Sequence, residues 1–184
     1  MDEINLGDIP DLSALSEGNS TNEWQNGWYA GTILSERSFV DRNGNERVFQ
    51  SGDEPSMNGD SRNIKLQVVV TSKEGRTIHV RYLVNYRPED LTQTTVQTVI
   101  ADRDKAESEQ DPALKRASIS LQRLAKLQRI GGVRAFSKTE GGGLELSALW
   151  NKNAYFKLGD DDRNPQFKNI KDVRDSRQPK VPVL

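Results

Sequence analysis

NIKLQVVVTSKEGRTIHVRYLVNY, residues 63–86, is the stretch that decides the fold. Apolar side chains alternate with polar ones on both sides of the turn TSKEGR. Because successive side chains of a strand point to opposite faces, this period of two predicts two strands in an antiparallel hairpin. The apolar set that we expect to face the core is Ile64, Leu66, Val68, Val70, Ile78, Val80, Tyr82 and Val84.

The opposite face of this hairpin carries polar candidates. Lys65 and Gln67 alternate with the apolar set on the first strand, and His79 and Arg81 do so on the second. If the two apolar faces coincide, these four side chains share one surface. His79 is either an ordinary histidine of the sheet surface or a residue that contacts nucleic acid.

Segments on both sides of the hairpin complete a predominantly β pattern. Residues 26–40 predict a bent first strand, and residues 41–60 predict a long loop or a small hairpin about Asn43 and Gly44. Residues 88–110 are compatible with strand or helix. Two closing strands are predicted at residues 154–158 and 167–173.

One helix is predicted at residues 111–131, with Asp111 as N-cap, Pro112 at the first helical position and Gly131 past the end. Its expected buried stripe is Leu114, Ala117, Leu121 and Leu124. The other side of the helix is basic, which fits a solvated face or, as a secondary candidate, a phosphate-binding face, with Lys115, Arg116, Arg123 and Lys126.

Composition restricts the function classes. The 184 residues contain no cysteine and a single histidine, so disulfides, thiolate zinc sites and a cysteine nucleophile are excluded. No apolar run is long enough to span a membrane and the N-terminal sequence is acidic, so we expect a cytoplasmic protein that is not exported.

The charge is distributed unevenly along the chain. Residues 1–60 carry 12 acidic against 3 basic side chains, a net charge of -9, and residues 61–184 carry 15 against 23, a net charge of +8. The basic part fits an anionic partner or an ordinary charge-mixed surface.

Three consecutive aspartates in the segment GDDDRNP, residues 159–165, raise the question of a metal site. Asp160, Asp162 and Asn164 match the first three ligand positions of an EF-hand loop. Pro165 and Lys171 stand where that loop needs a glycine and a bidentate glutamate. We therefore expect a solvated hairpin tip, no metal and no cofactor.

The predicted order of strands and helix, over about residues 26–175, resembles the OB-fold single-stranded-DNA-binding proteins of tailed bacteriophages. The segments that carry this resemblance are GWYAGTILSE, NIKLQVVVTSKEGRTIHVRYLV, LAKLQRIGGV and LSALWNKNAYFKLGDDDRNPQFKNIKDV. The resemblance implies a mainly β, five-stranded OB-fold, a Greek-key barrel with one α-helix between strands 3 and 4. The domain would span residues 23–175, between a flexible acidic arm at residues 1–22 and a flexible tail at residues 176–184.

The function that the resemblance implies is sequence-tolerant, non-enzymatic binding of single-stranded DNA during phage DNA replication or recombination, in the host cytoplasm. The expected partners are that DNA and replication or recombination proteins, with the chain a monomer or a small homo-oligomer. Such binding requires cations for the phosphates and flat side chains on which bases stack. The candidate nucleic-acid-binding residues are Trp28, Lys65, Arg76, His79, Arg81, Trp150, Tyr155, Lys157 and Lys168.

Three other functions stay open on the sequence. A protein-interaction module on the same fold needs no nucleic-acid affinity. Single-stranded RNA offers the same stacking surfaces and phosphates as DNA. A nuclease would need converging carboxylates and a metal, and Glu36, Glu145 and Asp172 are isolated in the sequence. The charge asymmetry also leads to the hypothesis that residues 1–22 fold over the basic surface and compete with DNA.

Overall fold

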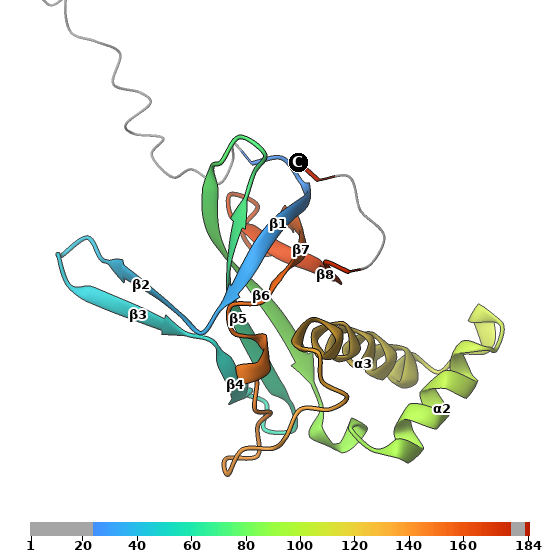
Figure 1. Cartoon of the computed structure of the whole chain (residues 1–184). Helices are drawn as coiled ribbons and strands as arrows, with labels where there is room; N and C mark the ends of the chain where they lie inside the picture. Colours follow the sequence, from blue (N-terminus) through green and yellow to red (C-terminus); the bar gives the residue numbers. More distant parts are fainter. Residues whose placement is uncertain (1–23, 178–182) are drawn as a thin grey trace, which may run out of the picture.

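The computed structural model describes residues 24–177 and 183–184, so the acidic arm at residues 1–22 lies outside the described residues. Six strands form one antiparallel sheet (Figure 1). One edge of β5 pairs with β6, and the other edge pairs with β1 and β4. On the far side of β1, the order continues with β7 and then β8. In chain order these strands are β1 (Gly27–Leu34), β4 (Gly52–Pro55), β5 (Arg62–Thr71), β6 (Thr77–Tyr86), β7 (Asn153–Asp160) and β8 (Lys168–Asp175).

The hairpin predicted from residues 63–86 is confirmed as β5 and β6, with Ile64 opposite Val84 and Val70 opposite Ile78. The predicted apolar set is buried except for Ile78, which is half-buried against the core. The closing strands are confirmed as β7 and β8, and they add apolar residues such as Phe156 and Val173 to the same core. One face of the sheet is therefore the core face, and we call the opposite face the outer face.

The expected fold class needs two corrections. The described residues form eight strands, where five were expected, because residues 36–55 fold into β2 (Glu36–Val40), β3 (Glu46–Gln50) and β4. β2 and β3 form a separate two-stranded hairpin, with Gly44 in its turn at a φ of 79°. From here on, the arm means this hairpin and not the acidic N-terminal segment at residues 1–22. The small hairpin about Asn43 and Gly44, one of the two alternatives for residues 41–60, is therefore the correct one.

The second correction concerns closure of the barrel and the number of helices. β6 and β8 approach one another, but no hydrogen-bonded ladder joins them in the described part of the chain, so the sheet is not a closed barrel. Two α-helices are described, where one was expected: α2 (Gln93–Arg103) and α3 (Pro112–Gly131). Thr92 caps α2 by accepting a hydrogen bond from the Thr95 N–H at 3.1 Å.

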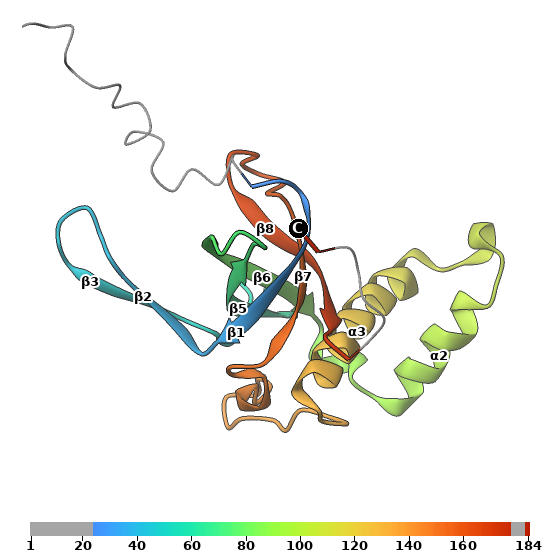
Figure 2. The same cartoon turned by 45° about the horizontal axis from the view of Figure 1, so that its top comes forward.

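α3 confirms the helix predicted at residues 111–131. Asp111 caps it by accepting a hydrogen bond from the Ala113 N–H at 2.8 Å, and the left-handed residue that ends it is Gly132, one position later than predicted. Of the predicted stripe, Ala117 and Leu124 are buried, and the buried face continues to Leu127 and Ile130. Both views show α2 and α3 on one side of the sheet and the arm on the other (Figures 1 and 2).

Asp53 on β4 connects four parts of the fold. Its side chain is 1% exposed and accepts hydrogen bonds from Arg62 Nε at 2.9 Å, from the Leu144 N–H at 2.7 Å and from the Tyr86 hydroxyl. Burial and the Asp53 hydrogen bond raise the pKa of Tyr86, so this phenol stays protonated as a donor. The carboxylate thereby links β4 to β5, β6 and the segment that precedes β7.

The described ends of the chain contact the sheet and α3. Arg177 donates a hydrogen bond to the Arg129 carbonyl oxygen at 2.6 Å, near the end of α3, and Val183 forms a parallel bridge with Trp28. Of the expected flexible tail at residues 176–184, residues 178–182 lie outside the described residues. No helix within the described ranges is long and apolar enough to cross a membrane.

Candidate nucleic-acid interface

The strand register brings six of the nine candidate residues onto the outer face of the sheet. Trp28 on β1 lies opposite Lys157 on β7, and Tyr155 lies opposite Ala30 of β1. Successive side chains of a strand point to opposite faces, so Lys65 on β5 and His79 and Arg81 on β6 also lie on the outer face. The predicted sharing of one polar surface by the two strands of the hairpin is therefore confirmed, with Arg81 opposite Gln67.

Two aromatic rings on this face differ in how they are held. The Trp28 ring is half-buried and the Arg174 guanidinium lies 5.4 Å from its centroid, which is a cation–π distance. Tyr155 is also half-buried and lies opposite Arg174 in the β7–β8 pairing. Arg174 thus stands between two stacking candidates, a combination that can hold a base and its phosphate side by side.

The cations of the outer face are solvent-accessible. Arg81 and Lys157 are exposed, and Lys65 makes one long contact of 3.5 Å to the exposed Glu54. Partial burial and the nearby positive charge of Arg37 lower the pKa of His79. The imidazole is therefore mainly neutral at pH 7 and can offer a hydrogen bond there, whereas Arg81 supplies charge.

One face of the arm carries residues that the sequence reasoning missed. Arg37 lies opposite Phe49 and Phe39 lies opposite Arg47, so all four side chains project from the same face. The two phenylalanine rings stack with centroids 4.8 Å apart and an interplanar angle of 26°, and Phe49 is 45% exposed. The sequence signal for this face is the alternation in ERSFV and ERVFQ, on either side of the Asn-Gly turn.

The base of the arm is fixed to the sheet by Ser51. Its hydroxyl donates to the Leu34 carbonyl oxygen at 2.6 Å and accepts from the Gln67 N–H at 2.7 Å, and its N–H donates to the Ser35 carbonyl oxygen at 2.8 Å. Gln67 is 3% exposed at this junction, which removes it from the accessible polar surface. We call the face of the arm that carries Arg37, Phe39, Arg47 and Phe49 the Arg/Phe face. Its Arg37 is near enough to His79 for its charge to lower the pKa of that imidazole.

Three candidate residues lie elsewhere. Arg76 lies in the β5–β6 turn, with its guanidinium 5.3 Å from the Trp24 ring centroid. Trp150 is half-buried and packs against the core just before β7. Lys168 is an ion-pair partner of Asp160 at 2.5 Å and also donates to Asn26, and its side chain is 9% exposed. These residues do not join the outer-face set.

The aspartate cluster forms the β7–β8 hairpin connection, as predicted. Asp161 accepts hydrogen bonds from the N–H groups of Arg163 and Asn164, and these bonds lower the pKa of its carboxyl group. Within residues 24–177 and 183–184, no group of three or more His, Cys, Asp or Glu side chains is placed to hold a metal ion. Through its two hydrogen bonds to backbone N–H groups, Asp161 shapes this turn.

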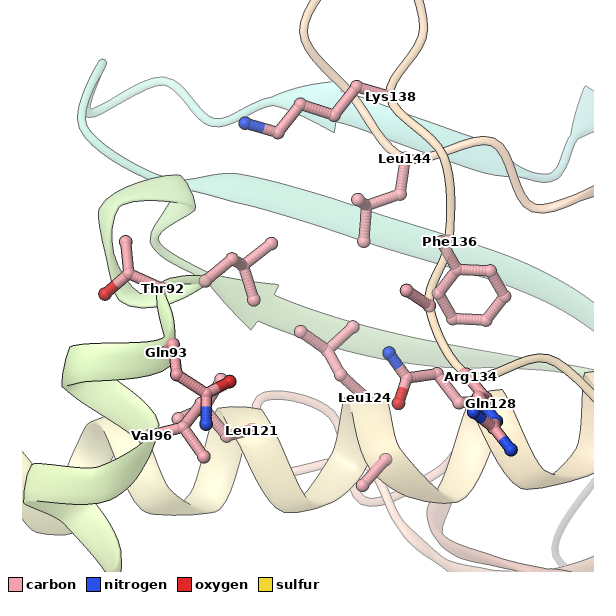
Figure 3. A pocket seen from close by; sticks show the side chains of 13 residues that line it. Thr92, Gln93, Val96, Leu121, Leu124, Gln128, Arg134, Phe136, Lys138 and Leu144 are labelled. Carbon is pink, nitrogen blue, oxygen red and sulfur yellow. The ribbon is translucent and has the colours of Figure 1, made fainter.

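A separate apolar groove lies between α2, α3 and the segment that precedes β7 (Figure 3). Its volume is about 460 Å³, and Leu124 of α3 and Leu144 point into it from opposite walls. Val96 of α2 and Phe136 extend the apolar lining, and Arg134 is a cation at its edge. This groove is on the helical side of the molecule, away from the arm.

Comparison with known proteins adds no relative to this description. No protein-family model matches the chain, and no curated protein matches it.

Proposed function

We propose that this chain binds single-stranded DNA with little sequence preference and without catalysis, as expected of a replication or recombination protein of a bacteriophage. The observation that carries the proposal is the combination of two surfaces. The outer face of the sheet offers Trp28, Tyr155 and Arg81, and the Arg/Phe face of the arm adds a stacked aromatic pair between arginines. Alternating cations and flat rings are what a sequence-tolerant single-strand binder needs.

The connectivity of the main sheet supports an OB-type fold for this function. If β2, β3 and β4 are taken as elaborations of the first loop, the remaining strands are β1, β5, β6, β7 and β8. The first of these pairs with the second and fourth, the fourth pairs with the fifth, and α3 lies between the third and fourth. In OB-folds, the strand face and adjoining loops bind oligonucleotides, and here the arm occupies the position of such a loop.

The direct test is a titration of a fluorescein-labelled oligo-dT by fluorescence anisotropy at several salt concentrations. We expect tight binding that weakens steeply with salt, because each phosphate contact releases counterions. Unlabelled duplex should compete poorly, and matched RNA as competitor measures the preference for deoxyribose. Absence of binding at low salt would refute the proposal.

Substitutions on the outer face then locate the interface. Tyr155→Ala removes one stacking surface and Arg81→Ala removes one exposed cation, so both should weaken binding, and only Arg81→Ala should reduce the salt dependence. Phe136→Ala, in the groove of Figure 3, is the control for a general effect of losing an aromatic ring. Equal losses in the control would place binding elsewhere.

The groove between α2 and α3 favours a second candidate function, a protein-interaction module. Its apolar lining can bind an apolar side chain of a peptide, and Arg134 at its edge would favour a peptide that also carries an acidic residue. This alternative predicts no affinity for the oligonucleotide and no change in the fluorescence of Trp28 on adding it. Oligonucleotide binding that quenches tryptophan fluorescence would decide against it.

Deleting residues 1–22 should raise the affinity for single-stranded DNA. Residues 1–22 carry five acidic and no basic side chains, and an acidic segment that covers the basic surface competes with phosphates. The comparison is between full-length and shortened chains in the same titration at low and moderate salt, where screening should reduce the difference. Identical affinities at low salt would exclude this competition.

A further inference from the structure

A recess lies at the seam where β6 and β8 face one another without a ladder in the described part of the chain. It has a volume of about 200 Å³ and is lined from three elements, with Arg81 from β6, Arg123 from α3 and Lys171 from β8. The carboxylate in its lining belongs to Asp162, whose side chain is 95% exposed and lies 3.1 Å from Lys171 Nζ. An exposed pair of this kind is weak, so cationic groups dominate the recess.

The Tyr82 hydroxyl is the second observation that points to a ligand. Tyr82 lines the recess and is 1% exposed, and its hydroxyl is the buried side-chain atom without a hydrogen-bond partner among the described residues. Buried hydroxyl groups almost always have a partner, so an exception calls for an explanation. Burial raises the pKa of Tyr82 to about 12, and the hydroxyl therefore remains a donor at neutral pH.

Two of the cations are unpaired among the described residues, and the third is fixed by packing. Arg81 and Arg123 have no ion-pair partner within residues 24–177, so neither is already neutralised. The stem of Lys171 covers Gly159 so closely that a Cβ atom at Gly159 would lie 2.6 Å from Lys171 Cγ. A side chain fixed by packing loses less entropy when it binds.

A second recess connects this site to the outer face of the sheet. It has a volume of about 330 Å³, shares Arg123 and Lys171 with the first and reaches Lys126 and Lys157. Lys126 is paired with Asp172 at 2.6 Å, whereas Lys157 faces the solvent. A row of cations therefore leads from beside Trp28, which lies opposite Lys157, to the recess at the seam.

We propose that the recess between β6, β8 and α3 binds a phosphate group. The Tyr82 hydroxyl and the guanidinium groups of Arg81 and Arg123 donate hydrogen bonds to its oxygens, and Lys171 adds charge. The phosphate is either inorganic phosphate or the terminal phosphate of a strand lying on the outer face. The second source rests on the function proposed above, and the first does not.

The first experiment measures thermal stability with millimolar inorganic phosphate against chloride at equal ionic strength. Phosphate should raise the Tm of the wild-type chain. Arg123→Gln should abolish the shift, and Arg116→Gln, on the same helix but outside both recesses, should keep it. Tyr82→Phe should be at least as stable as the wild type without phosphate, because its buried hydroxyl has no partner to lose, yet bind phosphate about tenfold more weakly.

The second experiment compares oligo-dT carrying a 5′-phosphate, a 3′-phosphate or neither. A terminal phosphate that tightens binding to the wild type but not to Arg123→Gln identifies the strand end as the source. A phosphate-dependent Tm shift with equal affinity for all three oligonucleotides identifies inorganic phosphate. Binding of all three alike with no phosphate-dependent shift would overturn the phosphate site and leave the proposed function standing. A phosphate-dependent shift without any oligonucleotide binding would support the phosphate site and refute the proposed function.

Discussion

Replacing Asp53 with alanine should lower the free energy of unfolding by about 3–5 kcal/mol, the usual cost of removing one partner from a buried ion pair. The change leaves the Arg62 guanidinium, the Tyr86 hydroxyl and the Leu144 N–H without their shared acceptor. The Arg62 side chain is only 13% exposed, so water cannot fully replace the lost carboxylate. Urea denaturation gives the change directly, and for a domain of this size the Tm should fall by about 10 °C.

Glu54→Ala is the matched control, because Glu54 is the next residue on the same strand. Its side chain is 60% exposed and its contact to Lys65 spans 3.5 Å, so the substitution should change stability by less than about 1 kcal/mol. A loss of that small size for Asp53→Ala as well would show that the carboxylate does not hold β4, β5, β6 and the segment before β7 together. Equal large losses would instead indicate that β4 itself is sensitive to any substitution.

The central part of the fold could be predicted from sequence because local patterns and tertiary packing agree there. The alternation in residues 63–86 matches a sheet with one buried face, and the polar face of the hairpin followed from the same period. α3 carried its cap signals at both ends, with its end one residue later than predicted, and its buried face shifted towards Leu127 and Ile130. This shift depends on how α3 sits against β6 and β8, which local sequence does not encode.

The parts that sequence reasoning missed depend on contacts between distant residues. Asp53 lies in a turn-rich segment, and its partners Tyr86 and Leu144 are 33 and 91 residues away. Lys168 was predicted to bind DNA, but its ammonium group donates a hydrogen bond to Asn26, which is 142 residues away in the sequence. The stacking of Phe39 on Phe49 required knowing that residues 46–50 pair with residues 36–40.

The double substitution Phe39→Ala and Phe49→Ala should weaken binding of single-stranded DNA by about 10- to 100-fold, since each stacked base contributes about 1–3 kcal/mol. The stacked rings lie on the face of the arm that also carries Arg37 and Arg47. Arg47 is paired with Asp41 at 3.0 Å, so Arg37 is the cation that can bind a phosphate beside stacked bases there. Among the described strands, β2 and β3 pair with one another in a sheet separate from the core sheet, so the stability of the domain should hardly change. Oligo-dT titration and urea denaturation of the same preparation test both halves of the prediction.

Val40→Ala with Val48→Ala is the control, because these exposed apolar side chains lie on the opposite face of the same two strands. A two-stranded hairpin is marginally stable by itself, so both double variants could loosen the arm to a similar extent. The valine variant should nevertheless bind DNA within a few-fold of the wild type, and Phe39→Tyr with Phe49→Tyr should restore the affinity by restoring the rings. If the phenylalanine and valine variants lose the same affinity, the arm contributes through its shape; if neither loses any, DNA binds to the outer face of the sheet without it.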